Sequence, residues 1–316
     1  MKRILAALLA VLLLAVSCIG CAERAGYRTE ENTGRDKDSY PYLVRTPSAT
    51  WHLSKADMEL LGEEAYRERL FSILDDMEAD FADARAAMKG YIPEDIPPVD
   101  LYTDFCNKAE ASKTADAFYR SLGNYIKLFK GWDTACYALL HEYVHYLTIH
   151  CAERPVQFHF WTEGIADYVS MYACKNRLAR SVNLALDLSA QPPEMLEQAW
   201  DKAENCLDPR LVCLGYALIF VRGYGVGQSY FAVKNETVER TEELQNHPVP
   251  EDLTFYEASG MVAYLAETYG TDTVFGNWDT DPDQMETVYG KTFPELYHDW
   301  TVWNEEQCSL AGIMIP

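Results

Sequence analysis

The sequence predicts an α+β fold in which a small layer of strands comes first and helices follow. Apolar residues recur at helical spacing between residues 70 and 88 and again after residue 133. Two segments between them, Val99–Phe105 and residues 124–132, have strand character. The chain has 316 residues, 48% of them hydrophobic and 13% aromatic, which is enough for one large packed domain or two small ones.

The N-terminus has the pattern of an export signal. Lys2 and Arg3 precede an uninterrupted apolar run over residues 4–16, which is short for a membrane span and typical of a signal peptide. The run ends in LAVSCIGCAE, which resembles the lipobox of bacterial lipoproteins, where a cysteine receives the lipid and becomes the mature N-terminus. Cleavage before Cys18 or before Cys21 fits this pattern. A plain signal peptide or an uncleaved anchor is the alternative.

We therefore expect a signal peptide over residues 1–21, a polar, flexible tether over residues 22–50, and one folded domain over residues 51–316. The formal charge of −22 becomes −24 when Lys2 and Arg3 leave with the signal peptide. So acidic a chain repels phosphate backbones, and the sequence has no basic stripe, so nucleic acid is not an expected partner.

The domain is expected to begin with one long amphipathic helix. Ser54 and Asp57 have the spacing of an N-terminal capping box, and Gly90 supplies a C-terminal stop. Apolar residues at intervals of three and four form one helical face: Leu70, Leu74, Met77, Phe81, Ala84 and Met88.

After the two strand segments, helices predominate. One is expected to start near Asp133 or Thr134, with an apolar face formed by Tyr137, Leu140, Val144 and Leu147. The next covers WTEGIADYVSMYACKNRL, with Thr162 as its candidate N-cap. Two further helices cover EASGMVAYLAETYG and KTFPELYHDWTVWNEEQ.

The helix after the strands contains HEYVH, an H-E-x-x-H pattern. His141 and His145 are four residues apart, so they project from the same face and can hold one metal ion together. Glu142 lies next to the first histidine, where it could take the proton of a metal-activated water and pass it to a leaving amine. The pattern can also arise by accident, so a third ligand decides its meaning.

Glu163 is the candidate third ligand. It begins the next predicted helix, and two antiparallel helices joined by a loop would bring its carboxylate back to the histidines. Asp167, four residues further on, shares its helical face and could hydrogen-bond a ligand histidine and fix its tautomer. Two imidazoles, one carboxylate and an open position are the ligand set of a catalytic Zn²⁺ ion.

H-E-x-x-H followed by E-G-x-A-x-Y resembles the gluzincin metallopeptidases, and among them the peptidase MA superfamily that includes the M1-type aminopeptidases. The resemblance implies a zincin-like fold with a mostly helical C-terminal lobe. It assigns His141, His145 and Glu163 as zinc ligands and Glu142 as the general base. TFYEASGMVAYLAETYG resembles a second family segment, in which Tyr256 corresponds to the tyrosine that hydrogen-bonds the oxyanion.

The sequence departs from the family in two places. It lacks the G-x-M-E-N-like element that binds a substrate's free amine, which disfavours a true aminopeptidase. The interval from Glu163 to Tyr256 is longer than in the family, so Tyr216, Tyr224 and Tyr230 compete with Tyr256. By the same resemblance, the strand at residues 124–129 would line the cleft and pair with extended substrate.

The expected function is therefore an exported zinc-dependent peptidase, lipid-anchored at Cys18 or Cys21 on the outer side of the cell membrane, with a peptide or protein as substrate. The alternative is a non-catalytic, peptide- or protein-binding surface lipoprotein on a peptidase-like fold. An accidental H-E-x-x-H in a helical interaction protein is a further alternative. The oligomeric state and the substrate specificity do not follow from the sequence.

Other patterns carry less weight. Seven cysteines follow Cys21, an odd number that leaves at least one without an intramolecular partner, and none of the seven belongs to a C-x-x-C. Cys206 and Cys213 either close a small disulfide loop or are buried thiols. His150 and His159 are expected to be structural. Residues 279–286 lack the glycine and the closing glutamate of a calcium loop, so a solvated acidic turn is expected.

Overall fold

The computed structural model describes residues 27–105, 117–129, 132–174 and 251–310. The chain divides into two compact units. The first comprises Met1–Phe81 and Ile96–Leu139, and the second comprises Ala82–Asp95 and Leu140–Pro316. The predicted α+β class is confirmed at this level, with a six-stranded sheet in the first unit and packed helices in the second.

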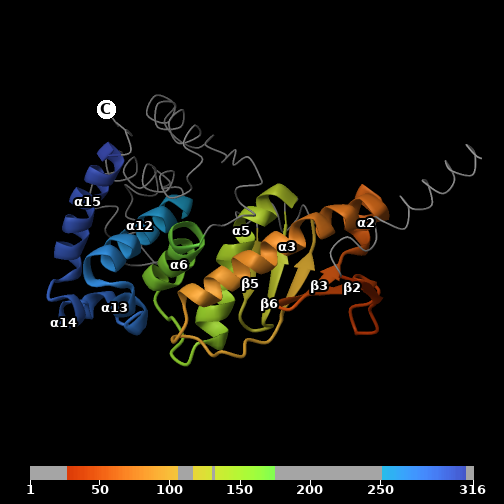
Figure 1. Cartoon of the computed structure of the whole chain (residues 1–316), viewed down its shortest axis with the longest axis horizontal. Helices are drawn as coiled ribbons and strands as arrows, with labels where there is room; N and C mark the ends of the chain where they lie inside the picture. The colour runs from red at the N-terminus through yellow and green to blue at the C-terminus, as the bar shows by residue number, and fades with distance from the viewer. Residues whose placement is uncertain (1–26, 106–116, 130–131, 175–250, 311–316) are drawn as a thin grey trace, which may run out of the picture. The chain divides into compact units, whose positions relative to one another are not determined.

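The sheet of the first unit has the strand order β1-β2-β3-β4-β6-β5 (Figure 1). Its strands are β1 (Thr29–Glu31), β2 (Tyr42–Arg45), β3 (Ala49–Leu53), β4 (Val99–Thr103), β5 (Ala117–Arg120) and β6 (Tyr125–Leu128). The central strands β3, β4 and β6 are parallel, with Trp51 opposite Leu101 and Leu101 opposite Ile126. The β1-β2, β2-β3 and β5-β6 pairs are antiparallel.

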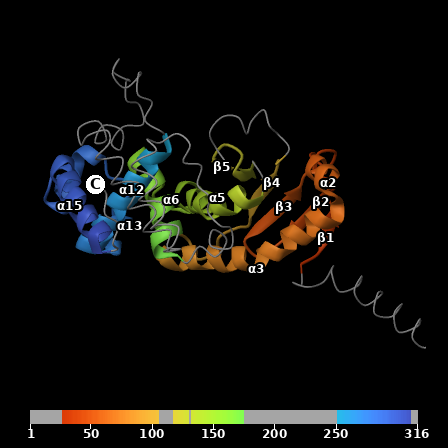
Figure 2. The ribbon, with the colours of Figure 1, turned by 90° about the horizontal axis from the view of Figure 1, so that it is seen from above.

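One face of the sheet is apolar and is covered by α3 (Glu63–Ala87), which runs along it in both views (Figures 1 and 2). Alternation along β4 places Val99, Leu101 and Thr103 on this face, and all three are buried. The Tyr66 and Thr103 hydroxyls are 2.5 Å apart, so a hydrogen bond joins α3 to β4. A second bond runs from the Ser48 hydroxyl to Glu78, at 2.6 Å.

The prediction of a single long helix over residues 54–90 is wrong, because the chain forms two helices there. Ser54 caps α2 (Lys55–Leu61), accepting a hydrogen bond from the Asp57 amide at 3.2 Å. At Gly62 the backbone takes a φ of +85°, which favours glycine, and α3 starts immediately after it. The six apolar residues predicted to share a face are all fully buried, so the face itself is confirmed.

The fold also begins earlier than expected. The segment 22–50 was expected to be a flexible tether, yet β1, β2 and the first residues of β3 lie within it. Asn32 holds the intervening loop in place, because its side-chain amide donates to the Tyr40 carbonyl at 2.7 Å and to Asp36 at 3.0 Å. Short strands joined by a polar loop give too few apolar residues to be recognised from the sequence.

The strand at residues 124–129, which was expected to pair with extended substrate, corresponds to β6. The prediction that this strand pairs with substrate is wrong, because in the described sheet β6 has no free edge. Both edges of β6 are already hydrogen-bonded, one to β4 and the other to β5. The sheet therefore ends at β5, a strand that the sequence did not predict.

The second unit is helical. It contains the end of α5 (Trp132–His145), then the π-helical turn η1 (Tyr146–Cys151), α6 (His159–Asp167) and a second π-helical turn, η2 (Tyr168–Ala173). The C-terminal part adds α12 (Glu251–Tyr269), α13 (Thr271–Gly276), the 3₁₀ turn η3 (Pro282–Gln284), α14 (Glu286–Tyr289) and α15 (Phe293–Leu310). Helix α12 contacts α6, α13 and α15 (Figures 1 and 2).

Two details of this unit bear on the sequence predictions. Thr162 is not the N-cap of its helix, since α6 begins at His159 and the Thr162 hydroxyl donates to the Phe158 carbonyl at 3.0 Å. The acidic segment at residues 279–286 contains η3, in which the Asp281 side chain accepts from the Asp283 amide at 2.9 Å. No helix within the described ranges combines the length and the apolar character that a membrane span requires.

Candidate metal centre

The histidines of HEYVH lie on the last two turns of α5. Leu140, Val144 and Leu147 of the predicted apolar face are fully buried, and the side chain of Tyr137, its fourth member, is not among the described ones. On another side of the helix, the rings of His141 and His145 meet edge to face with their centroids 4.5 Å apart. The helical spacing therefore brings the two imidazoles together on one face.

Glu163 and Asp167 reach the histidines from α6. Helix α6 is buried on several sides, since Phe160, Ile165 and Ala166 are all fully buried, and it packs closely against α12. Gly164 permits this approach, because a Cβ at that position would lie 2.9 Å from Val262 and 3.0 Å from the Ala258 carbonyl oxygen.

The donor atoms of three residues converge. His141 Nε2 lies 3.2 Å and His145 Nε2 lies 3.3 Å from the same oxygen, Glu163 Oε2. All ligand atoms of this group lie within 4.8 Å of one another, so His141, His145 and Glu163 could hold a metal ion. Tetrahedral coordination at Zn–N and Zn–O distances of about 2.0–2.2 Å separates neighbouring donors by roughly 3.4 Å, which matches the two observed distances.

Asp167 orients His141. Its Oδ1 lies 2.6 Å from His141 Nδ1, so the imidazole donates through Nδ1 and turns Nε2 toward Glu163. Burial alone would lower the pKa of His141, but the charge of Asp167 and its hydrogen bond raise that pKa well above its usual value. Asp167 is itself buried, which strengthens its interaction with the ring.

The electrostatics of Glu163 follow from the same arrangement. Burial would raise the pKa of its carboxyl, but His145 and His141 oppose this through charge and hydrogen bonds, and they hold the pKa far below its usual range. Glu163 is therefore an ionised carboxylate aimed at two imidazoles. An ionised carboxylate and imidazole nitrogens are donors that Zn²⁺ accepts.

Glu142 and His145 add two further features. Glu142 follows His141 directly and is buried, with 8% of its surface exposed. His145 Nδ1 is buried and has no hydrogen-bond partner among the described residues, in contrast to Nδ1 of His141. With Nδ1 facing away, His145 presents Nε2 to the group.

Two features of the site were missed by the sequence analysis. The Arg85 guanidinium donates to the Tyr143 hydroxyl at 2.7 Å, and Tyr143 lies between the two histidines on α5. In addition, α5 and α6 each pass into a π-helical turn just after their last site residue, His145 and Asp167. Helical periodicity marks Arg85 only as a residue in the last turn of a long helix, and no residue pattern predicts a π-turn.

Several predicted site residues fall outside what the structure describes. Tyr256 lies in α12, but its side chain is not among the described ones, and Tyr216, Tyr224 and Tyr230 lie outside the described residues, as do Cys18, Cys21, Cys206 and Cys213. His150 is exposed and stacks on Tyr146, with ring centroids 5.6 Å apart, and the candidate metal group does not include it. Cys151 carries a free thiol.

Comparisons with known proteins give no relative. The chain matches no protein-family model, no curated protein and no solved structure. Any statement about its function therefore depends on the chemistry of the residues themselves.

Proposed function

We propose that this chain is an exported zinc-dependent peptidase with a zincin-like fold of the gluzincin type. The observation that carries the proposal is the convergence of His141 Nε2 and His145 Nε2 on one oxygen of Glu163, at 3.2 and 3.3 Å. The H-E-x-x-H pattern and the distant glutamate are candidate ligands on sequence spacing alone, and a pattern that arose by chance would not be expected to bring these three side chains together.

The ligand set favours zinc over magnesium and calcium. Magnesium and calcium prefer oxygen ligands and coordination numbers of six or more, whereas two imidazoles and one carboxylate are a typical catalytic zinc set. The buried contact from His141 to Asp167 is the kind of hydrogen bond that orients ligand histidines in zinc enzymes.

Zinc, when bound, would lower the pKa of a water molecule toward neutrality and polarise a carbonyl group. Glu142 would accept the proton of the attacking water and transfer it to the leaving amine, as general base and then general acid. Tyr256 remains the candidate donor to the oxygen that develops negative charge. The peptide or protein substrate would lie outside the membrane, to which a lipid on Cys18 or Cys21 would attach the enzyme.

Cleavage of a peptide library by the zinc-loaded protein tests the proposal. Glu142→Gln should retain zinc and lose about 100-fold or more in the rate of hydrolysis, because it removes the proton acceptor and keeps the shape of the side chain. Glu153→Gln, a change of the same kind at an exposed glutamate after η1, serves as the matched control and should keep full activity.

Two results would contradict parts of this proposal. Full activity in Glu142→Gln would remove Glu142 as the general base. Stoichiometric zinc in the native protein without cleavage of any peptide would favour the alternative, a non-catalytic binding lipoprotein on a peptidase-like fold.

A further inference from the structure

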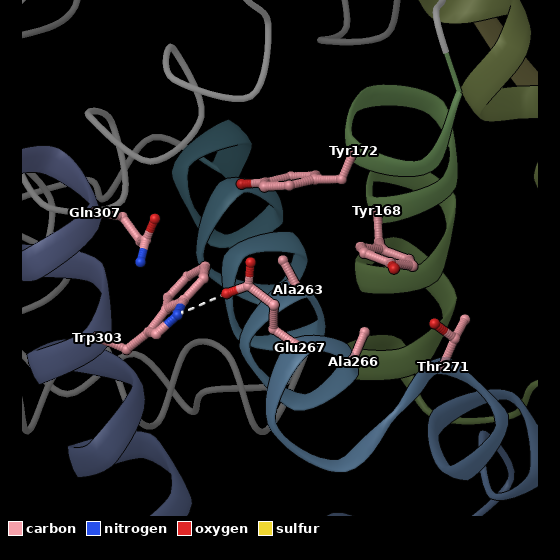
Figure 3. A pocket seen from close by; sticks show the side chains of 8 residues that line it. All are labelled: Tyr168, Tyr172, Ala263, Ala266, Glu267, Thr271, Trp303 and Gln307. Atoms are coloured by element: carbon pink, nitrogen blue, oxygen red, sulfur yellow. Dashed lines mark hydrogen bonds between the residues drawn. The ribbon is translucent and has the colours of Figure 1, made fainter. Parts of the chain in front are cut away.

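A cavity lies in the helical unit beside α12, and its lining includes none of the candidate metal ligands. The cavity has a volume of about 210 Å³ and lies over α12, between η2 and α15 (Figure 3). Pockets for drug-sized ligands have volumes of about 300–1,000 Å³. This cavity is therefore sized for a small group or for the end of a single side chain.

Aromatic rings form two sides of the cavity. Figure 3 shows Trp303 of α15 on one side and Tyr168 and Tyr172 of η2 on the other. The two tyrosine rings are stacked, with centroids 5.9 Å apart and an interplanar angle of 25°. Between these walls, Ala263 and Ala266 of α12 form a floor of small side chains, which leaves the space open.

Glu267 supplies the charge. Among the described residues that line the cavity, it is the only ionisable acid or base apart from the tyrosines. The Trp303 indole N–H donates to Glu267 Oε2 at 2.9 Å, and this bond holds the carboxylate between the two aromatic walls (Figure 3). The bond also fixes the indole ring, so the charge and the largest ring of the site are positioned together.

We infer that this cavity binds an organic ammonium group. Tryptophan and tyrosine rings attract cations through their negative faces, and a carboxylate beside them adds direct attraction. The net charge of −22 attracts cations to the molecule as a whole and disfavours an anionic ligand. The described lining residues offer a bare metal ion one carboxylate and no imidazole or thiolate.

The ammonium site shares no residue with the candidate metal group. Glu163 and Asp167 contact the α5 histidines, whereas Gly164 of the same helix faces Val262 of α12. The cavity residues come from η2, α12, α15 and Thr271, and none of them belongs to the group that could hold a metal. Binding can thus be measured with zinc present or absent, and its failure would leave the proposed peptidase untouched.

Fluorine NMR of the full-length chain labelled with 5-fluorotryptophan tests the inference. The chain has seven tryptophans, and Trp303→Phe identifies the resonance of Trp303. Tetramethylammonium and butylammonium should each shift that resonance in a saturable way, and tert-butanol, a neutral molecule of similar size, should not. Stronger binding of butylammonium would indicate a lysine side chain as occupant, and stronger binding of tetramethylammonium a quaternary head group.

Two variants separate charge from shape. Glu267→Gln keeps an oxygen for the Trp303 indole and removes the charge, so both cations should bind about fivefold more weakly or worse. Ala263→Leu fills the floor of the cavity and should abolish the shift. Glu306→Gln, the same change at an exposed residue of α15 outside the lining, should leave both affinities unchanged.

The inference is overturned by any of three results: no shift of the Trp303 resonance with either cation, an equal response to tert-butanol, or unchanged affinities in Glu267→Gln.

Discussion

Asp167 is the residue that determines which nitrogen of His141 is available to a metal. Its carboxylate holds Nδ1 at 2.6 Å, so the lone pair of Nε2 is directed toward Glu163 once the ring loses its second proton. In the metal-free protein the same carboxylate raises the pKa of His141 well above its usual value. Metal and proton therefore compete for the same ring.

This competition gives a pH dependence with a defined sign. A raised pKa means that His141 still carries its second proton near neutral pH, and metal binding must release it. The apparent affinity for zinc should rise as the pH increases toward the pKa of His141. Titration calorimetry in buffers of different ionisation enthalpy should detect the proton release, and the absence of any release at neutral pH would contradict the assignment.

Asp167→Asn keeps a hydrogen-bond acceptor at Nδ1 and removes the charge. We expect zinc affinity to fall by about 10- to 100-fold, the usual effect of losing such a partner, and the proton release at neutral pH to diminish. Asp38→Asn, the same substitution at an exposed residue of the β1–β2 loop, is the control and should change neither quantity. Equal effects of the two variants would show that Asp167 has no specific role.

The residues of the candidate metal site were easier to predict from the sequence than the elements or the sheet. His141, Glu142, His145, Glu163 and Asp167 were singled out by spacing alone, and the structure brings the histidines, Glu163 and Asp167 together. Helical geometry makes this possible, because residues four apart share a face whatever the tertiary fold. Arg85 could not be found in this way, since its bond to Tyr143 joins residues 58 positions apart.

At the scale of elements, the close packing of α6 against α12 holds Glu163 in place. Gly164→Ala should destabilise the protein by about 1–3 kcal/mol, because the added methyl group would meet Val262 and the backbone of Ala258. It should also weaken zinc binding, since Glu163 is the preceding residue. Gly276 of α13 has open space around its Cβ position, so Gly276→Ala should stay within about 1 kcal/mol of the native protein.

Urea unfolding of the metal-free protein measures the stability change of each variant. Equal free energies of unfolding for Gly164→Ala and Gly276→Ala would mean that α6 can move away from α12 without loss of stability. This result would contradict the claim that the packing of α6 against α12 holds Glu163 in place.

Element boundaries were less predictable than element types. The prediction of an apolar helical face over residues 70–88 was correct. The end of a helix at Gly62 was not predicted, because the segments on both sides of this glycine favour helix. The π-turns after His145 and Asp167 depend on the packing of each helix end, which leaves no periodic pattern in the sequence.

At the scale of the whole molecule, the sequence predicted fewer strands than the sheet contains. Strands β1, β2 and β5 have three or four residues each, too few for alternation to be distinguished from loop. The described strands begin at Thr29, so a lipid-bearing Cys18 or Cys21 would be joined to the folded part by about ten residues or fewer. A lipid anchor at either cysteine would then hold the folded part close to the membrane surface.

Lipidation can be measured by incorporation of radiolabelled palmitate in a bacterial host. We expect label in the native chain and its loss in either Cys18→Ala or Cys21→Ala, whichever removes the modified residue, with the other substitution harmless. A native chain without label would point to a plain signal peptide or an uncleaved anchor.

Metal content after exhaustive dialysis tests the central claim most directly. The native protein and Glu142→Gln should each retain one zinc ion per chain, because Glu142 is assigned to proton transfer and not to coordination. His145→Ala and Glu163→Ala should retain little or none, because each removes one of three converging ligands. A native protein without stoichiometric zinc, or ligand variants that keep it, would contradict the account.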